Sequence, residues 1–147
     1  LVILVRLAGA AQRANRPLAG PAEHAAALEA LRRRSARELS ALGICNEVAD
    51  IHRALANLAS DRRLLRQAEL RPRAHNEALR GAGAAELRYA LGGRSGQLHT
   101  LEIKLNPHLA PLSDEARVIL ARVAGACEDA LERAHARSSH PELVAAG

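Results

Sequence analysis

The fold class of this chain is decided by residues 86–105, which read ELRYALGGRSGQLHTLEIKL. Apolar and other residues alternate on both sides of a glycine-rich turn, and the apolar set is Leu87, Tyr89, Leu91, Leu101, Ile103 and Leu105. A period of two is typical of strands that bury one face. We therefore predict a β-hairpin, and because an isolated hairpin is only marginally stable, it must pack on helices or on further strands.

The residues before the hairpin have a helical period. We expect a helix to begin near Pro21, whose fixed φ suits a first helical turn. Apolar residues then recur at intervals of three and four in a narrow stripe: Ile44, Val48, Ile51, Leu55, Leu58 and Leu65. Such a narrow stripe is typical of a seam between paired helices. Residues 21–70 are therefore predicted to be a helical dimerisation region that self-associates through this seam.

The residues after the hairpin predict one more helix. Ser113 is a good N-cap, and Asp114 and Glu115 would offset the helix dipole in the first turn. We assign the hairpin and this helix to residues 71–137, and a disordered tail to residues 138–147. The fold class is mostly α within α+β: long helices in a helical hairpin or a dimeric coiled-coil-like bundle, then one β-hairpin and a C-terminal amphipathic helix.

Residues 1–20 form a separate segment, in which an apolar stretch, LVILVRL, precedes a connector rich in proline and glycine. Seven residues are too few to cross a bilayer, which takes about 20 apolar residues. We expect either the cytoplasmic end of a spanning helix that lies upstream of residue 1, or a short buried strand. In the first case the arginines that follow would place the rest of the chain in the cytoplasm.

The composition excludes some kinds of site. Tyr89 is the one aromatic residue among 147, and Phe, Trp and Met are absent. A platform on which single-stranded nucleic acid could stack is therefore excluded, and an aliphatic core of closely packed helices is favoured. Cys45 and Cys127 are too few for a disulfide scaffold, so we expect buried thiols in a reducing compartment.

The chain is basic, with 21 Lys and Arg against 16 Asp and Glu. The densest basic patch comprises Arg32, Arg33, Arg34 and Arg37. This patch is either a solvated helix face or, with Arg53, Arg62, Arg63 and Arg66, a surface that binds the phosphates of nucleic acid.

The stretch from Arg32 to Ser40, RRRSARELS, resembles the first dimerisation helix of bacterial sensor histidine kinases, whose motif reads Arg-x-x-Ala-Arg-Glu-Leu-His-Asp. Ser40 stands where that family has its phosphoacceptor histidine, and Ala41 where it has the aspartate. Residues 112–123 are similar to the segment that enters the first nucleotide-binding helix of the same family.

In that helix the family's catalytic Glu and Mg²⁺-binding Asn correspond to Ala126 and Ala130. The resemblance therefore implies a degenerate relative without kinase activity, with no catalytic residue, cofactor or metal. It also implies a homodimer, and a response regulator or a sensor as partner.

A second resemblance concerns the C-terminal part. Residues 101–105, the Leu112-Ser113-Asp114-Glu115 stretch and residues 124–134 are similar to the last strand and exit helix of GAF sensor domains. Both resemblances predict a non-catalytic bacterial signal-transduction module that is cytoplasmic or tethered to a membrane at its N-terminus. The alternatives are a nucleic-acid-binding protein with an arginine-rich helix, and an inert helical fragment without a specific function.

Overall fold

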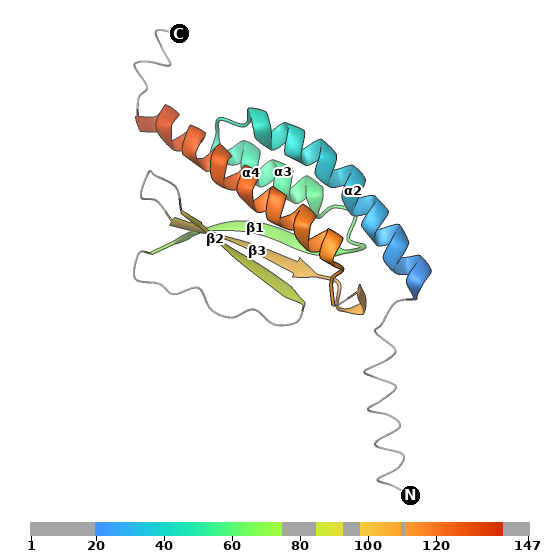
Figure 1. Cartoon of the computed structure of the whole chain (residues 1–147). Helices are drawn as coiled ribbons and strands as arrows, with labels where there is room; N and C mark the ends of the chain where they lie inside the picture. The colour runs from blue at the N-terminus through green and yellow to red at the C-terminus, as the bar shows by residue number, and fades with distance from the viewer. Residues whose placement is uncertain (1–19, 75–84, 93–97, 110, 140–147) are drawn as a thin grey trace, which may run out of the picture.

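The computed structural model describes residues 20–74, 85–92, 98–109 and 111–139. Within these residues, three α-helices cover one face of a three-stranded antiparallel sheet (Figure 1). The elements in chain order are α2 Pro21–Ile44, α3 Val48–Leu58, β1 Leu65–Arg73, β2 Glu86–Gly92, β3 Leu98–Leu105, a short 3₁₀ helix Pro107–Leu109, and α4 Asp114–Ser139. The mixed α+β class is therefore as predicted.

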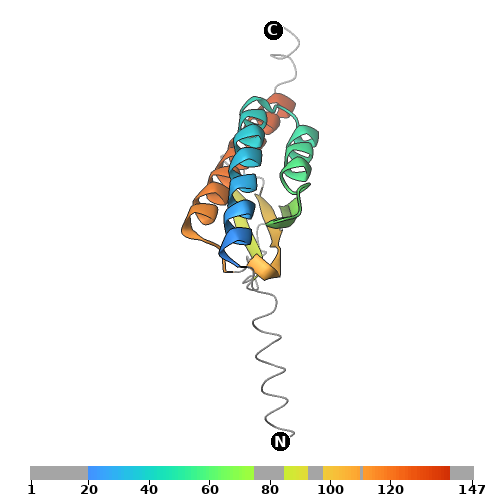
Figure 2. The same cartoon turned by 90° about the vertical axis from the view of Figure 1, so that its right-hand side faces the viewer.

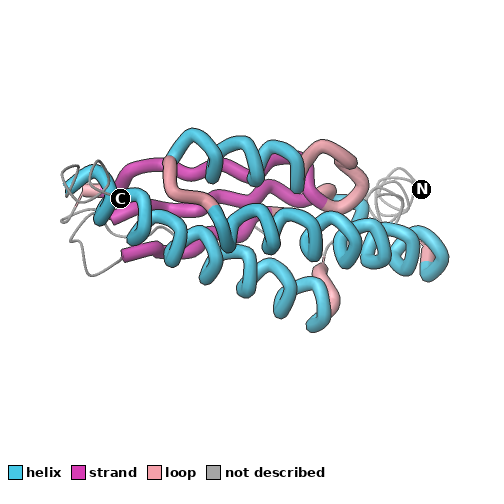
Figure 3. Tube along the Cα trace, turned by 90° about the horizontal axis from the view of Figure 1, so that it is seen from above, coloured by secondary structure: helices cyan, strands magenta, loops and turns pink. Residues whose placement is uncertain are grey.

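The helices lie in two layers over the sheet. Helix α3 packs on β1 and α4 packs on β2, whereas α2 packs on α3 and α4 and forms the outer layer. Viewed from the side and from above, α2 lies between its two neighbours (Figures 2 and 3). It buries one stripe of side chains, half of which are small: Ala27, Ala30, Leu31, Ser35, Glu38 and Leu42. Small residues at these positions allow α2 to approach the groove between α3 and α4 closely.

Strand β3 is the centre of the sheet and the base of the core. It pairs with β1 on one side and β2 on the other, and its inward side chains Leu101, Ile103 and Leu105 are 0–3% exposed. The opposite face carries charges, with Arg71 and Arg88 both paired to Glu102. This arrangement is the usual alternation of an antiparallel sheet with one covered face.

Strands β2 and β3 and helix α4 form where the sequence predicts two strands and a helix. Strands β2 and β3 pair antiparallel without a register shift from Leu98 onward, although Leu98 is out of phase with the alternation of Leu101, Ile103 and Leu105 and predicts a bulge or a later strand start. Helix α4 begins after Ser113, whose Oγ accepts a hydrogen bond of 3.2 Å from the amide of Ala116. The hairpin turn at residues 93–97, the segment at residues 1–19 and the tail from residue 140 lie outside the described residues.

The prediction of one continuous helical seam is wrong. Helix α2 ends at Ile44, Cys45 is extended, and α3 starts anew at Val48. The preceding Gly43 weakens the helix at this point, since glycine costs about 1 kcal/mol relative to alanine in a helix interior. The predicted seam residues therefore do not share one environment. Ile51, Leu55 and Leu58 are 0–2% exposed in the chain's own core, whereas Ile44 is 80% and Val48 42% exposed.

The sixth seam residue, Leu65, begins strand β1, so the helical assignment of residues 21–70 is also wrong after residue 58. A register shift between Leu65 and Gln67 explains the error. The extra residue puts Leu65 on the same buried face as Ala68 and Leu70, at spacings of three and two. The bulge therefore produces a spacing of three residues between buried side chains, which is typical of a helix. Near its end, β1 carries Pro72 opposite His99, as only an edge strand readily tolerates.

Candidate functional site

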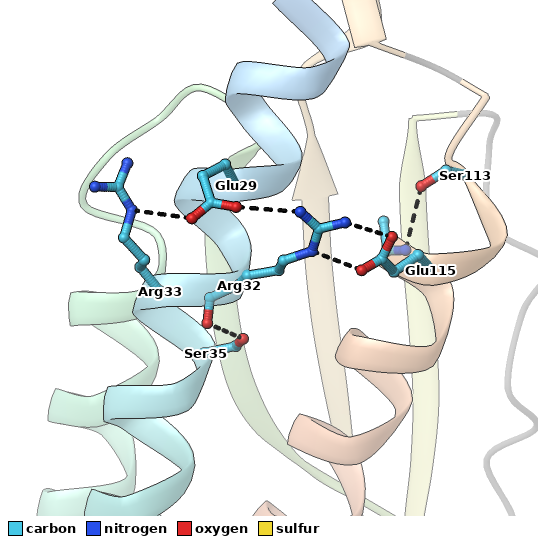
Figure 4. A network of polar contacts seen from close by, with 7 residues as sticks. Glu29, Arg32, Arg33, Ser35, Ser113 and Glu115 are labelled. Atoms are coloured by element: carbon cyan, nitrogen blue, oxygen red, sulfur yellow. Dashed lines mark hydrogen bonds and ion pairs between the residues drawn. The ribbon is translucent and has the colours of Figure 1, made fainter.

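The arginine run at the middle of α2 divides between two sides of the helix. Arg32 turns toward α4, where its Nε and Nη2 atoms donate to the two carboxylate oxygens of Glu115 at 2.6 and 2.7 Å. Arg33 points the other way, and Figure 4 shows Glu29 between the two arginines. Successive residues of an α-helix lie about 100° apart, so a run of three cannot share one face.

Arg32 and Glu115 tie α2 to the start of α4. The bidentate hydrogen bonds lower the pKa of the Glu115 carboxyl and raise the pKa of Arg32, which Glu29 also contacts at 3.1 Å. Both side chains are about half exposed, at 45% and 49%. Arg32 is therefore occupied by α4 and does not join the rest of the predicted basic patch.

Arg34 turns toward the end of α3. Its Nη1 atom donates to the carbonyl of Asn57 at 3.1 Å and to the hydroxyl of Ser60 at 2.6 Å, and its Nε atom lies 3.6 Å from Asp61. The Nε atom of Arg63 contacts the other oxygen of the Asp61 carboxylate at 3.2 Å. One carboxylate thereby brings together an arginine of α2 and an arginine of the turn that precedes β1.

These contacts form the wall of an open pocket of about 260 Å³, which we call the arginine pocket. It is lined by Ala30, Arg33, Arg34, Arg37, Asp61 and Arg63. Four arginines and one aspartate line the pocket, so positive charge exceeds negative charge in its lining, and two of these arginines contact the aspartate. The structure thus brings together three of the four residues of the predicted basic patch and adds Arg63, which the sequence placed only in the nucleic-acid alternative.

Two of the other three arginines of that alternative, Arg53 and Arg66, have local partners. Arg53 contacts Asp50 at 3.3 Å within α3, and Arg66 donates to the side chain of Asn106 at 3.4 Å. Sequence reasoning missed Asp61, which organises the pocket, although the charged turn Ser60-Asp61-Arg62-Arg63 directly after α3 is a visible signal.

A second set of contacts ties α2 to the end of α4. Arg133 donates through Nη2 to the carbonyl of Leu42 at 2.6 Å and through Nε to the carbonyl of Cys45 at 3.2 Å. Arg137 lies 3.9 Å from Glu47 just beyond. The last carbonyl groups of a helix lack intrahelical partners, and Arg133 adds a charged donor to that of Leu42, which also accepts from the amide of Cys45 at 3.2 Å. No local sequence signal reveals this contact, because the partners are 88 and 91 residues apart.

The positions that correspond to the kinase family's functional residues are unsuited to its chemistry. Ser40 is exposed on α2 and donates to the carbonyl of Ala36 at 3.2 Å. Ala130 is fully buried, at 0% exposure, so the position of the family's Asn faces the core here. Burial raises the pKa of the Cys127 thiol to about 12, as for a structural rather than a reactive cysteine.

Within the described ranges, no group of three or more His, Cys, Asp or Glu side chains could hold a metal ion. No helix in the described part of the chain is long and apolar enough to cross a membrane. No protein family, curated protein or solved structure matches this chain.

Proposed function

We propose that this chain is a non-catalytic signal-transduction module, in which α2 and α4 together carry a displacement from one end of the domain to the other. Its partners would be a second copy of itself and a sensor or response-regulator protein. The proposal places the module in the cytoplasm, free or tethered through its N-terminus. It is in keeping with the resemblances to sensor histidine kinases and GAF domains.

The observation that carries the proposal is the geometry of α2 and α4. The two helices run in the same direction (Figure 1), with Arg32 tied to Glu115 where α4 begins and Arg133 tied to Leu42 where α2 ends. We call these the entry end and the exit end of the pair. At 24 and 26 residues, the helices are about 36 and 39 Å long at 1.5 Å per residue. The described chain therefore enters at one end of the fold and leaves at the other, as a relay within a longer signalling protein requires.

The arrangement also supports the non-catalytic part of the proposal. The strand and exit helix that resemble a GAF domain are present as β3 and α4, with the helix directly covering the sheet. The kinase resemblance calls for a nucleotide site on α4, but the apolar face of α4 is packed in the core at Leu120, Val123 and Cys127.

The surface available for self-association is smaller than the predicted seam. Ile51, Leu55 and Leu58 are occupied inside the fold, which leaves Ile44 and Val48 as the exposed remainder of the stripe. We therefore place the proposed dimer contact at the junction of α2 and α3, where these two apolar side chains lie close along the chain.

The relay is tested by amide hydrogen exchange on Arg133→Met. If α2 and α4 move as one body, loss of the exit-end contact should speed exchange at residues 22–30, near the entry end, as well as at residues 42–48. The matched control is Arg137→Met, which removes an exposed charge from the same end. Faster exchange confined to residues 42–48 would contradict the relay.

The absence of kinase activity is tested by incubating the chain with labelled ATP and Mg²⁺. We expect no acid-labile phosphate on the protein, because serine replaces the phosphoacceptor at position 40. Incorporation that disappears in His52→Ala would show that the chain is a phosphoacceptor after all.

Sedimentation equilibrium tests the dimer. We expect a mass of twice the 15.6 kDa of the chain, and dissociation in Ile44→Asp, whose side chain is exposed and makes no core contact. Val118→Asp is the matched control, since Val118 is an exposed apolar residue elsewhere, on α4. A monomeric wild type, or equal dissociation by both variants, would exclude the junction as the contact.

A further inference from the structure

We propose that the arginine pocket binds the diphosphate group of a small phosphorylated anion. This inference does not rest on the proposed signalling role, because the pocket lies on the side of α2 that faces the end of α3, away from the α4 contacts. Guanidinium groups bind phosphate oxygens through paired, charge-assisted hydrogen bonds, so four converging arginines suit a phosphorylated ligand.

Part of the pocket is held in place without a ligand. Arg34 is fixed by three partners, which are the Asn57 carbonyl, the Ser60 hydroxyl and the Asp61 carboxylate. Ser60 is itself held by a hydrogen bond of 2.7 Å to the Asn57 carbonyl. Asp61 also holds Arg63 through its Nε atom, while both Nη atoms of Arg63 have no hydrogen bond to other described residues. Ordered arginines lose little side-chain entropy on binding, which favours affinity.

The rest of the pocket is left with unused donors. Arg37 lines the wall and has no hydrogen bond or ion pair within the described part of the chain, so its guanidinium is free to contact a ligand. Arg33 is 71% exposed, and its one carboxylate partner, Glu29, is distant at 3.8 Å. Donors that face an open concavity and lack protein acceptors are what an anion site requires.

The backbone beside the pocket supplies an independent observation. Arg62 has a φ of 65°, in the left-handed region that residues with a side chain rarely adopt. This conformation is unfavourable for a residue with a side chain, and such positions concentrate at functional sites. It turns the chain sharply between Asp61 and Arg63, so that both flanking side chains line the same pocket.

The size and shape of the pocket limit the ligand. Its volume of about 260 Å³ is below the roughly 300–1,000 Å³ of pockets that enclose a drug-sized ligand. It has room for phosphate groups, and a nucleoside attached to them would remain in solvent. A nucleic-acid duplex presents a row of phosphates along an extended surface, whereas Arg53 and Arg66 beyond the pocket are tied to local partners.

The test is calorimetric titration of the full chain with inorganic pyrophosphate at low salt. We expect saturable binding with one site per chain, and about tenfold weaker binding by Arg37→Gln, the loss that corresponds to one charge-assisted hydrogen bond. Arg53→Gln is the matched control, since it makes the same charge change on α3 outside the pocket. Arg63→Gln should weaken binding like Arg37→Gln, with folding checked by circular dichroism.

The outcomes distinguish a free diphosphate from a nucleoside diphosphate as the ligand. They also distinguish a diphosphate site from a nucleic-acid-binding surface. A free diphosphate and a nucleoside diphosphate should bind equally well if only the phosphates enter the pocket; tighter binding of the nucleotide would overturn the size argument. No saturable binding, or equal weakening by Arg37→Gln and Arg53→Gln, would overturn the site. Binding of duplex DNA that pyrophosphate does not displace, and that Arg53→Gln weakens as much as Arg37→Gln, would show a nucleic-acid surface instead.

Discussion

The entry end and the exit end of the α2–α4 pair are held by equally short contacts of different strength. At the entry end, Arg32 and Glu115 lie 2.6 Å apart, and both remain about half exposed. At the exit end, Arg133 makes a contact of the same 2.6 Å to a helix carbonyl at a partly buried position. Exposed ion pairs contribute little, because water and salt screen them. The lengths of these contacts therefore do not predict their relative contributions to stability. Those contributions depend on how exposed each contact is.

The exit end also contains buried residues beside the exposed Ile44 and Val48. Cys45, directly after the last residue of α2, is 6% exposed, and Cys127 on α4 is 0% exposed. If Arg133 were lost, the carbonyl of Leu42 would keep the amide of Cys45 as a donor at 3.2 Å, whereas the carbonyl of Cys45 would lose its hydrogen bond to Arg133. The entry end has no such dependence, since both of its charged partners are already in contact with water.

The largest expected effect is on thiol chemistry. Burial raises the pKa of Cys127 to about 12, and we expect its alkylation at pH 8 to be about a thousandfold slower than that of an unfolded cysteine. Burial also raises the pKa of Cys45. Mass spectrometry after iodoacetamide treatment, with and without urea, measures both rates. Native labelling of Cys45 at the rate of a free thiol would show that the exit end is open.

Substitution of the exit-end arginine should have the largest effect on stability. We expect Arg133→Met to lower the free energy of unfolding by about 2–3 kcal/mol, because the carbonyls of Leu42 and Cys45 lose a charged donor. Arg137→Met, which removes a 3.9 Å ion pair beside it, should cost less than about 1 kcal/mol. Urea unfolding monitored by circular dichroism gives both values. Equal losses of stability in the two variants would mean that the hydrogen bonds from Arg133 to the two carbonyls contribute nothing beyond the effect of removing a positive charge.

The helix cap at the entry end should have an intermediate effect. Ser113→Ala removes the acceptor for the Ala116 amide and should cost about 1 kcal/mol. Ser113→Asp retains an acceptor and should preserve stability. Ser40→Ala is a matched control within α2, where serine has no cap role and the change should be neutral or slightly stabilising. The same urea experiment decides, and a loss in Ser40→Ala equal to that in Ser113→Ala would contradict the capping role.

The smallest effect is expected from the entry-end ion pair. The lowered pKa of Glu115 means that its contribution is present above its ordinary pKa of 4.5 and is lost as the pH falls through the folded value. The urea midpoint of Glu115→Gln should therefore be slightly below that of the wild type at neutral pH, and the two should converge in acid or at about 1 M salt. A difference that persists at high salt would show that the pair is stronger than its exposure suggests.

Much of the fold could be predicted from local patterns. The alternation in residues 86–105 gives strands β2 and β3, and Ser113 with the acidic residues after it gives the start of α4. Each of these signals depends on residues that are neighbours in sequence. Strand β1 could not be predicted in the same way, because the bulge after Leu65 disguises its period.

The function of the apolar stripe could not be read from its spacing. Ile51, Leu55 and Leu58 would follow the same interval whether they faced a second copy or β1 of the same chain. The arginine pocket illustrates a second limit of prediction from sequence, which concerns the positions of charged side chains. The sequence indicates a basic cluster, but only the fold shows that Arg32 leaves it and that Asp61 joins Arg34 to Arg63.

Pro72 determines which side of the sheet is vulnerable to aggregation. In the described part of the chain, β1 and β2 are the outer strands, and an outer strand can recruit a strand of another molecule through its free amides. Pro72 has no amide hydrogen, and Arg71 and Arg73 beside it add repulsion between copies. Strand β2 has no proline and contains Tyr89-Ala90-Leu91. Intermolecular β-pairing under destabilising conditions would therefore start from β2, and a proline introduced into that strand on its outward side would suppress it.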